Sequence, residues 1–205
     1  NVQAMCDSFR RFSFVSVKAG GACHDSTAFA QSWLGVLLRE GKFPAGFYIM
    51  GDAAYASHLN LLVPWPGRAL SCVKDSFNFW QSHARINIEC AFGILVRKWL
   101  ILSRGIECEL EDAHMIIRAC FLLHNFLLYD GEIVDNEADI QRDGGCSLQP
   151  TFASECHTQP HLDDHRAVRS RGLKGLVYLD LLTKDLRDAG MLRPGKTAAD
   201  YSVFE

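Results

Sequence analysis

Runs of apolar residues at the start of the chain predict a β-hairpin followed by a helix. Residues 1–6 and 12–17 are short β-prone runs separated by the polar stretch 7–11, which is typical of two adjacent strands. After a glycine-containing loop, apolar side chains at helical spacing predict one amphipathic helix from about residue 25 to Gly41. Its apolar face consists of Phe29, Trp33, Val36 and Leu37.

A short, wholly apolar run at residues 47–50 predicts a central strand. The run is bounded by Gly46 and Gly51, and an uninterrupted apolar run of this length is typical of a strand that is buried on both faces. Asp52 follows directly, so it is expected at the end of that strand. Residues 59–63 predict a further strand before two prolines.

The next part of the chain has the period of a helix. An apolar stripe begins near residue 84, and Glu89 is expected at the edge of the buried face, about a quarter-turn from the stripe. A further helix is predicted over residues 111–128, and because its second half is apolar nearly all round we expect it to be buried. Strands followed by long helices predict an α/β domain. The stripe comprises Ile88, Phe92, Leu95 and Trp99.

The composition changes after these helices. Residues 130–164 carry nine acids against one arginine, which predicts a flexible linker or insertion. Residues 166–196 carry eight basic residues against three acids, and their leucine spacing predicts an amphipathic helix. The chain is therefore divided into an α/β domain over 1–129, an acidic linker over 130–165 and a basic amphipathic segment over 166–205.

The overall composition is that of a soluble globular protein. A chain of 205 residues, 48% hydrophobic and 22% charged, is long enough for one well-buried domain. A net charge of -3 gives no basic excess, so any contact with nucleic acid must come from local clusters. The longest apolar stretch, 115–128, is interrupted by polar residues and too short to span a bilayer, so no membrane association is expected. Eight cysteines without zinc-site spacing favour reduced thiols.

Three acids stand at the ends of predicted strands or on a helix able to pack against them: Asp7, Asp52 and Glu89. Taken singly, Asp52 is explained by a turn that its carboxylate caps, and Glu89 by an ion pair with Arg85 four residues earlier. Taken together, three converging carboxylates can bind a pair of Mg²⁺ ions, which activate the attacking oxygen and stabilise the leaving oxygen of a phosphodiester. Phosphoryl transfer on nucleic acid is the chemistry that such a set suits.

Two further pairs of polar residues each have a structural and a functional interpretation. Asp25 is interpreted either as a helix N-cap or as a residue close to the metal ligands, and His24 as its orienting partner or as incidental. His124 and Asn125 lie in the most apolar predicted helix, where hydrogen bonds to backbone groups are favoured over catalysis.

Two basic pairs follow the acids in sequence. Arg10 and Arg11 come after Asp7, and Arg97 and Lys98 come after Glu89. Each pair is interpreted as a solvated face or as a contact with DNA phosphates beside the metal site. The chain has no phosphate-binding loop, dinucleotide-binding glycine motif, nucleophile elbow or zinc-protease motif, so an enzyme with a nucleophilic side chain has little support.

Several motifs occur in a fixed order along the chain. They are the acidic strand and turn at 6–12, a Gly…His-Asp segment at 21–29, Gly-Asp-Ala-Ala-Tyr at 51–55, a helical segment at 83–93 preceded by Phe77-Asn78, and Leu-His-Asn-Phe at 123–126. In this order they resemble the DDE nuclease domain of PIF/Harbinger transposases and their domesticated relatives. The resemblance covers about residues 2–128, and residues 169–194 are similar to the family's basic carboxyl-terminal segment.

The resemblance implies an RNase H-like fold, a mixed sheet flanked by helices. It also implies a DNA endonuclease or transposase dependent on Mg²⁺ or Mn²⁺, which cleaves and joins phosphodiester bonds with two metal ions. Asp7 and Asp52 would share the metal pair and Glu89 would complete the shell of one ion. Cys90 and residues 94–96 replace an arginine and a Leu-Lys pair that many relatives carry around this glutamate, which bears on local DNA contacts.

The resemblance has further implications for partners and location. Family members commonly depend on a separate Myb-like protein for nuclear entry and DNA-end recognition, so such a partner and a nuclear location are implied, or a cytoplasmic location without the partner. DNA is the expected substrate and a homo-oligomer the expected assembly. We expect the family's amino-terminal helix-turn-helix region to be absent. The alternative is a non-catalytic, domesticated or truncated derivative that serves as a DNA- or protein-interaction module.

Overall fold

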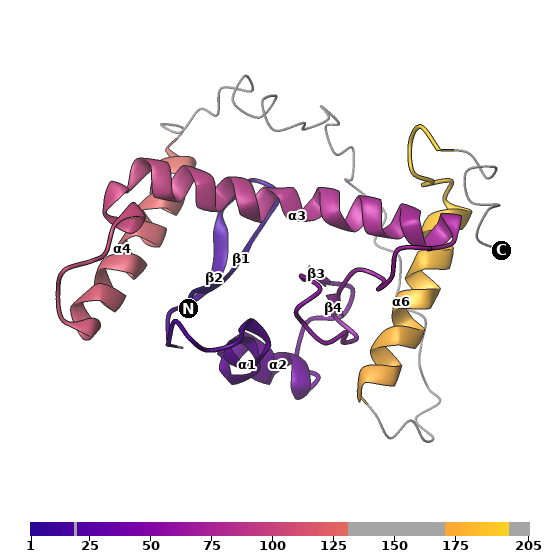
Figure 1. Ribbon diagram of the computed structural model, residues 1–205, viewed down its shortest axis with the longest axis horizontal. Helices are drawn as coiled ribbons and strands as arrows, with labels where there is room; N and C mark the ends of the chain where they lie inside the picture. Colours follow the sequence, from indigo (N-terminus) through magenta and orange to yellow (C-terminus); the bar gives the residue numbers. More distant parts are fainter. Residues whose placement is uncertain (19, 131–170, 197–205) are drawn as a thin grey trace.

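Helix α3 (Cys72–Lys98) is the long element around which the described residues are arranged. A hairpin, two short helices and a pair of short strands lie along one side of α3 (Figure 1). Helix α4 (Leu110–Tyr129) lies near one end of α3, and helix α6 (Arg171–Asp188) crosses the other end (Figure 1). The predicted α/β class is confirmed. The computed structural model describes residues 1–18, 20–130 and 171–196.

Strands β1 (Gln3–Cys6) and β2 (Phe12–Ser16) form the predicted hairpin, and they pair antiparallel. Phe12, the first residue of β2, is buried, and its ring meets that of Phe121 in α4 edge to face, with 4.5 Å between the ring centroids. Polar residues at 7–11 form the connecting turn. The hairpin is therefore anchored to α4 at the end that carries this turn.

The single helix predicted after the hairpin is divided into α1 (Asp25–Gln31) and α2 (Trp33–Arg39). Ser32 separates them, because its backbone is extended and its hydroxyl both donates to a carbonyl of α1 and accepts from the amide of Gly35. A side chain at Gly35 would collide with the α1 backbone, so glycine permits this tight turn. The break leaves Trp33 68% exposed, so the predicted apolar face is wrong at this residue.

The predicted central strand is shorter and more exposed than expected. Strand β3 spans only Ile49–Met50 and pairs in parallel with β4 (Leu61–Leu62), so a strand at 59–63 is confirmed in part. A two-stranded sheet has no central strand, and Met50 of β3 is 39% exposed, so β3 is not buried on both faces. Phe47, before β3, is 66% exposed. The single mixed sheet is not seen in the described residues, whose strands form two separate pairs.

Helix α3 begins at Cys72, well before its predicted start. The first half of the helix lacks a clear apolar period in its sequence. It is covered by tertiary contacts that such a period cannot reveal. Phe77 packs with residues of β4 and α6, and Gln81 donates hydrogen bonds to the carbonyl oxygens of Gly51 and Leu62, at 2.6 and 3.3 Å. These contacts fix β3 and β4 against the middle of the molecule.

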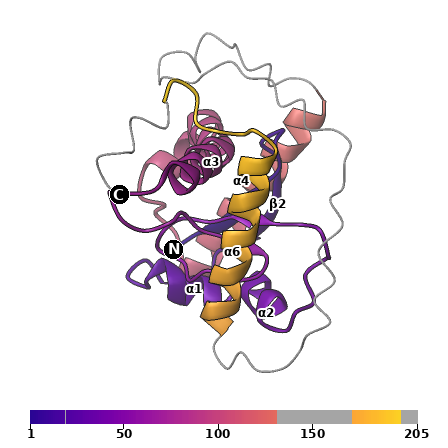
Figure 2. The ribbon, with the colours of Figure 1, turned by 90° about the vertical axis from the view of Figure 1, so that its right-hand side faces the viewer.

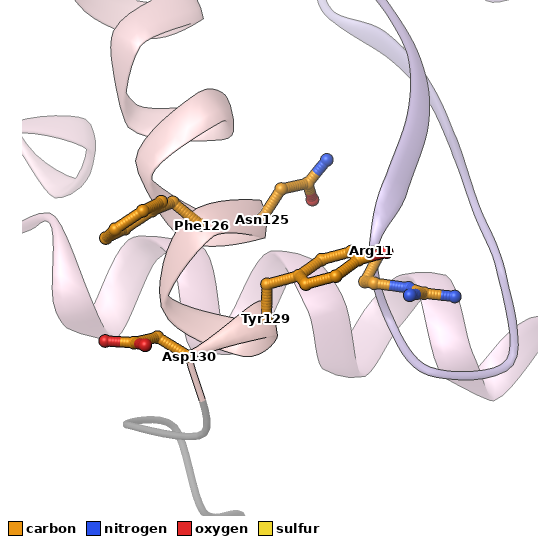
Figure 3. Close-up of a pocket in the computed structure, with 5 residues that line it drawn as sticks. All are labelled: Arg11, Asn125, Phe126, Tyr129 and Asp130. Carbon is orange, nitrogen blue, oxygen red and sulfur yellow. The ribbon is translucent and has the colours of Figure 1, made fainter.

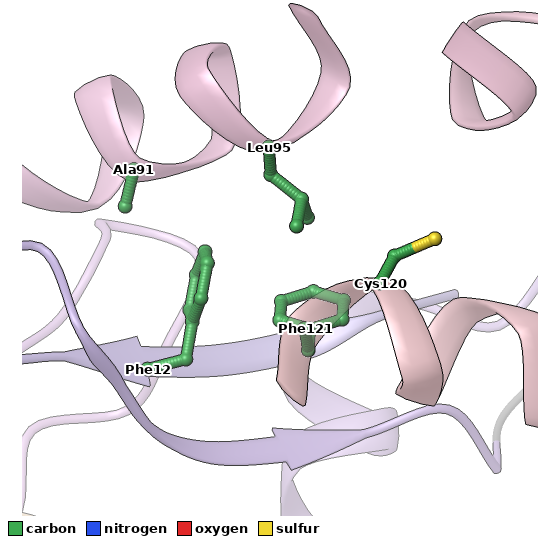
Figure 4. Close-up of a cluster of buried hydrophobic side chains, with 5 residues drawn as sticks. All are labelled: Phe12, Ala91, Leu95, Cys120 and Phe121. Carbon is green, nitrogen blue, oxygen red and sulfur yellow. The ribbon is translucent and has the colours of Figure 1, made fainter. Parts of the chain in front are cut away.

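The second half of α3 forms the main hydrophobic core with the hairpin and α4. Ala91 and Leu95 point from α3 toward Phe12 of β2 and toward Cys120 and Phe121 of α4 (Figure 4). Leu95 is 2% exposed, and the apolar stripe predicted for this half of the helix is confirmed. Glu89 therefore lies on a helix whose apolar face is packed in the core.

A short 3-10 helix, η1 (Leu100–Ser103), leads from α3 to α4. The bounds of α4 agree closely with the predicted helix, but its predicted burial on all sides is wrong. Phe121 and His124 face the core, whereas the opposite side of the helix is exposed. In the part of the chain that the structure describes, no helix is both long and apolar enough to cross a bilayer. The exposed stripe of α4 includes Met115, Leu122, Phe126 and Tyr129.

Helix α6 is the amphipathic helix predicted near the carboxyl end, and it packs against the first half of α3 and against β4. Figure 2 shows α6 beside α3. The hydroxyl of Tyr178 in α6 is hydrogen-bonded to that of Tyr48, next to β3. Beyond α6, Arg193 forms an ion pair with Asp75 in the first turn of α3, at 3.0 Å. Residues 131–165 of the predicted linker lie outside the described residues.

Candidate functional site

Two of the three predicted metal ligands share one arginine. Arg85 lies one turn before Glu89 in α3, and its Nη2 atom is 3.4 Å from Oδ2 of Asp52 and 3.5 Å from Oε1 of Glu89. The two carboxylate oxygens can therefore be no further apart than the sum of these distances. The ion pair expected for Glu89 alone is present, but the same guanidinium also draws Asp52, from a different element, toward Glu89.

Asp52 stands at the carboxyl end of β3, where ligand sites of α/β proteins collect. The preceding Gly51 donates from its amide to the Leu62 carbonyl at 2.8 Å, and a Cβ atom at Gly51 would approach a methyl group of Leu61 to 2.8 Å. A side chain at Gly51 would therefore have to displace the side chain of Leu61. The Oδ1 atom of Asp52 accepts from the amide of Ala54 at 2.9 Å, so the carboxylate also caps a turn, as expected for Asp52 alone.

Asp7 lies in the turn that joins β1 to β2, residues 7–11, which we name the Asp7 turn. Its Oδ1 atom accepts from the amides of Phe9 and Arg11, at 2.9 and 3.0 Å. Its Oδ2 atom is 2.8 Å from Nε and 2.7 Å from Nη2 of Arg11, a two-pronged ion pair. Both oxygens of Asp7 are therefore engaged within its own turn.

The end of β1 that carries Asp7 faces the part of α3 that carries Glu89. Cys6 packs against the core formed by α3, the hairpin and α4. Burial, and after it the negative charge of Asp7, raises the pKa of the Cys6 thiol to about 11, and the nearby Cys90 adds to this rise. Because Cys90 follows Glu89 directly, Asp7 and Glu89 belong to neighbouring parts of two packed elements.

The complete triad is not assembled as a metal cage. Among residues 1–18, 20–130 and 171–196, no three histidine, cysteine or acidic side chains are grouped so that they could hold a metal ion. The donor chemistry nevertheless fits Mg²⁺, whose preferred ligands are carboxylate oxygens. Asp52 and Glu89 already face a single cationic group, Arg85, as they would face a metal ion. Convergence of Asp7 with these two residues stays a prediction.

The structure places His24 and Asp25 away from the Asp7 turn. His24 is the N-cap residue of α1 without a capping side-chain hydrogen bond, and Asp25 is the first residue of the helix, so the predicted cap role of Asp25 is wrong. The Oδ1 atom of Asp25 instead accepts from the side-chain amides of Asn1, at 2.8 Å, and Gln3, at 3.3 Å. Gln3 begins β1, and Asp7 follows the other end of the same strand.

Gln3 and Tyr55 were missed from the sequence, although they connect Asp25 with the region of Asp52. The Tyr55 hydroxyl donates to Oε1 of Gln3 at 2.7 Å, while Nε2 of Gln3 donates to Asp25. Burial, and after it the charge of Asp25, raises the pKa of Tyr55, and the charge of Asp52 contributes as well. The available signal in the sequence was a polar residue at the start of a predicted strand. The structure shows that Gln3 is only 7% exposed, and a buried polar side chain needs hydrogen-bond partners.

The predicted DNA-contacting arginines and lysine have different surroundings. Arg11 is engaged with Asp7, and its guanidinium also lies 5.1 Å from the ring centre of Phe9. Arg97 and Lys98 are exposed in the last turn of α3, about two turns beyond Glu89. Cations are also favoured at a helix carboxyl end by the helix dipole, so a role in DNA binding stays a prediction for them, as it does for Arg10.

An open hollow of about 620 Å³ lies beside the Asp7 turn (Figure 3). Arg11, the ion-pair partner of Asp7, forms one wall, and residues from the last turns of α4 form the other (Figure 3). The guanidinium of Arg11 lies 5.5 Å from the ring centre of Tyr129, so the end of α4 is in contact with the turn beside this hollow. The lining residues from α4 and its end are Asn125, Phe126, Tyr129 and Asp130.

The sequence model of one protein family, described as DDE superfamily endonuclease, matches residues 1–125. The chain belongs to this family. The match confirms the resemblance to Harbinger-type transposase-derived nucleases, and it spans Asp7, Asp52 and Glu89 as well as the hairpin, α3 and most of α4. Helix α6 lies beyond it. No curated protein and no solved structure matches the chain.

Proposed function

We propose that this chain is a Mg²⁺-dependent DNA endonuclease or transposase domain with an RNase H-like arrangement. The observation that carries the proposal is the pairing of Asp52 and Glu89 on Arg85 in a chain of the DDE endonuclease family. The two acids come from elements far apart in the sequence, and α3 and β3 are packed so that both reach one cation. DNA is the substrate that family membership supports.

Asp7, Asp52 and Glu89 would hold the metal, Mg²⁺ or Mn²⁺, as a pair of ions. Such ions activate the attacking oxygen and stabilise the leaving oxygen of a phosphodiester. The protein residues bring the charges together: Arg85 offsets the repulsion between Asp52 and Glu89, and Arg11 offsets the charge of Asp7. Asp25 acts at a distance, through Gln3 and Tyr55, on the loop that carries Asp52.

The basic residues near these acids complete the proposal. Arg10, Arg11, Arg97 and Lys98 contact DNA phosphates, which position the protein without reading bases. Sequence recognition and nuclear entry come from a Myb-like partner, and the working assembly is a nuclear homo-oligomer. With a net charge of -3 the chain alone binds DNA weakly, and salt weakens that binding further.

A second function is favoured by one specific observation. Both oxygens of Asp7 are engaged within its own turn, by Arg11 and by the amides of Phe9 and Arg11, and the described residues contain no three-residue metal group. A domesticated derivative that keeps the fold as a DNA- or protein-interaction module would retain this arrangement without needing a metal. The exposed stripe of α4 would suit such a role, since contiguous apolar surface marks interaction sites.

A cleavage assay on plasmid and oligonucleotide DNA with Mg²⁺ or Mn²⁺ separates the two functions. Asp52→Asn and Glu89→Gln are expected to reduce the cleavage rate roughly a thousandfold, because each removes a metal ligand worth several kcal/mol to the transition state. Asp112→Asn and Glu111→Gln, in the first turn of α4, are the matched controls and should cleave at the wild-type rate. Metal-independent DNA binding with no cleavage by the wild type would favour the interaction module.

A further inference from the structure

The Asp7 turn has an unusual backbone for the residues that it contains. Arg10 has φ of 64°, in the left-handed region that side chains other than glycine rarely adopt. Two backbone hydrogen bonds close the turn, from the amide of Asp7 to the carbonyl of Arg11 and from the amide of Arg10 to the carbonyl of Asp7, both at 3.0 Å. Strain of this kind persists only where surrounding groups hold the backbone in place.

Asn125 of α4 holds one end of this turn from outside. Its Oδ1 atom accepts from the amide of Phe12 at 2.8 Å, and its Nδ2 atom donates to the carbonyl of Phe12 at 2.7 Å. The side-chain amide thus takes the place that the backbone of a neighbouring strand would take beside β2. Leucine has about the same size and would fill the space, but it would leave both backbone groups of Phe12 without these partners.

His124, the preceding residue, holds the strained residue itself. Its ring is completely buried and lies against Phe12, with 4.9 Å between ring centroids. Its Nε2 atom is 3.0 Å from the carbonyl oxygen of Arg10. A carbonyl oxygen can only accept, so Nε2 carries a proton and donates it. The Nδ1 atom is buried without a hydrogen-bond partner, which agrees with an unprotonated nitrogen.

From these contacts we infer that His124 and Asn125, together the α4 clamp, are positioning residues for Asp7 in the proposed metal site. This inference rests on the proposed function. The clamp forms hydrogen bonds with the backbone of Arg10 and Phe12, and these bonds do not involve the carboxylate of Asp7. The turn can therefore keep its place when the Asp7 carboxylate exchanges Arg11 and the amides of Phe9 and Arg11 for a metal ion.

The clamp is needed because Asp7 otherwise has two tasks that exclude each other. In the metal-free chain its Oδ1 atom stabilises the turn by accepting from two amides, while its Oδ2 atom binds Arg11. A metal ion would withdraw oxygens from these contacts. Groups hydrogen-bonded directly to a metal ligand typically contribute tenfold to hundredfold in metal affinity, and the α4 clamp acts one step further out, on the backbone that carries Asp7, so we expect an effect at the lower end of this range.

The experiment compares the full chain with three variants, each checked by circular dichroism and used well below its unfolding temperature. Asn125→Leu removes the amide contacts with Phe12 at similar volume. His124→Gln keeps an N–H donor for the Arg10 carbonyl and serves as the conservative replacement. Cys120→Ala is the matched control, because Cys120 is buried in the same helix and core without a hydrogen bond to the turn.

Two measurements are made on each chain: amide hydrogen exchange at Arg11 and Phe12, and the Kd for Mn²⁺ from its electron paramagnetic resonance signal. For Asn125→Leu, we expect exchange in the turn at least about tenfold faster and Mn²⁺ binding about tenfold weaker. His124→Gln should stay within about threefold of the wild type, and Cys120→Ala within about twofold, in both measurements.

The outcomes separate the inference from the proposed function. If the wild type binds Mn²⁺ and Asn125→Leu binds it equally well, or if Cys120→Ala weakens binding as much, the α4 clamp has no positioning role and the inference is overturned. If exchange in the turn responds as expected but the wild type binds no Mn²⁺, the metal-dependent function fails, and with it the link from the clamp to a reaction. Unchanged exchange in Asn125→Leu would contradict the clamp itself.

Discussion

Asp52 and Glu89 both contact Arg85, which lies in the same helix as Glu89, whereas Asp7 contacts an arginine of its own turn. Arg85 reaches Asp52 across the packing of β3 against α3, so their contact depends on tertiary structure. Arg11 lies four residues from Asp7, and their ion pair depends only on the local backbone. One half of the candidate site is thus built by packing and the other half by a turn.

The difference shows which structural changes would separate the acids in each half of the site. A shift of β3 along α3 would separate Asp52 from Glu89, and Gln81 opposes such a shift through its hydrogen bond to the Gly51 carbonyl. The Asp7 turn keeps its shape locally, and the α4 clamp and the core under Phe12 fix its place in the molecule. Changes to the two halves should therefore act differently on metal binding and on stability.

The largest effect is expected from divalent metal. At a hundredfold excess over Kd, Mn²⁺ that binds only the folded chain raises the free energy of unfolding by about 2.7 kcal/mol. Asp52→Asn should abolish this gain and leave the metal-free fold within about 1 kcal/mol of the wild type, since Asp52 is half exposed. Thermal unfolding with and without Mn²⁺ measures both, with Asp112→Asn as the control. A full metal response in Asp52→Asn would exclude Asp52 as a ligand.

The next effect separates the clamped turn from the exposed face of the same helix. Asn125→Leu should lower the free energy of unfolding by about 2 kcal/mol, because the amide and carbonyl of Phe12 lose their partners. Leu122→Asn changes a side chain that is 71% exposed, so it should lie within about 0.5 kcal/mol of the wild type. Urea unfolding compares the two. Equal losses would mean that α4 is stabilised equally on both faces.

A smaller effect is expected from pH, through His124. Burial lowers the pKa of His124 in the folded chain, and the hydrogen bond to the Arg10 carbonyl only partly opposes this. The unfolded chain therefore takes up the proton first. The stability that the neutral ring confers is complete above about pH 6.5 and is lost as the pH falls through that value toward the lower folded-state pKa.

One proton gives a slope of at most about 1.4 kcal/mol per pH unit, and His124→Gln should remove it. The free energy of unfolding of both chains, measured by urea between about pH 5 and 8, gives the contribution of His124 as the difference between the two curves. Parallel curves would show that burial does not hold the His124 ring neutral in the folded chain.

The smallest effects are expected from the two arginines. Arg85→Gln and Arg11→Gln should each change the free energy of unfolding by less than about 1 kcal/mol, because the partner carboxylates are between 36% and 67% exposed and salt screens the pairs. Both variants should bind Mn²⁺ more tightly, since each removes a competing cation from a carboxylate. Urea unfolding and Mn²⁺ titration at low and high NaCl test this. Weaker binding in Arg85→Gln would mean that Arg85 supports the site rather than competes for it.

The sequence was informative where a local period determines the structure. Hairpin strands, the second half of α3 and the bounds of α4 follow from alternation and from apolar residues at helical spacing. The early start of α3 does not, because Gln81 and Phe77 are buried by contacts with β3, β4 and α6 that no local pattern contains. The break at Ser32 depends on the close approach of Gly35 to the backbone of α1, which only the folded chain reveals.

Burial was harder to predict than secondary structure. The apolar second half of α4 was expected to be enclosed, yet Phe126 is 63% exposed, because hydrophobic character says that a residue favours burial and not what is available to cover it. The same applies to Phe47 before β3. For the site, residue type and position made the three acids candidates, but the sharing of Arg85 depends on packing between β3 and α3, which spacing alone cannot give.

The central claim is that Asp7, Asp52 and Glu89 form one metal site despite their different supports. Anomalous diffraction from crystals soaked in Mn²⁺ tests it most directly, because it locates each ion relative to each carboxylate. The account predicts two Mn²⁺ peaks about 3.5–4 Å apart, with oxygens of all three acids at coordinating distance and with Arg11 and Arg85 displaced from them. Mn²⁺ bound only between Asp52 and Glu89, with Asp7 still paired to Arg11, would contradict it.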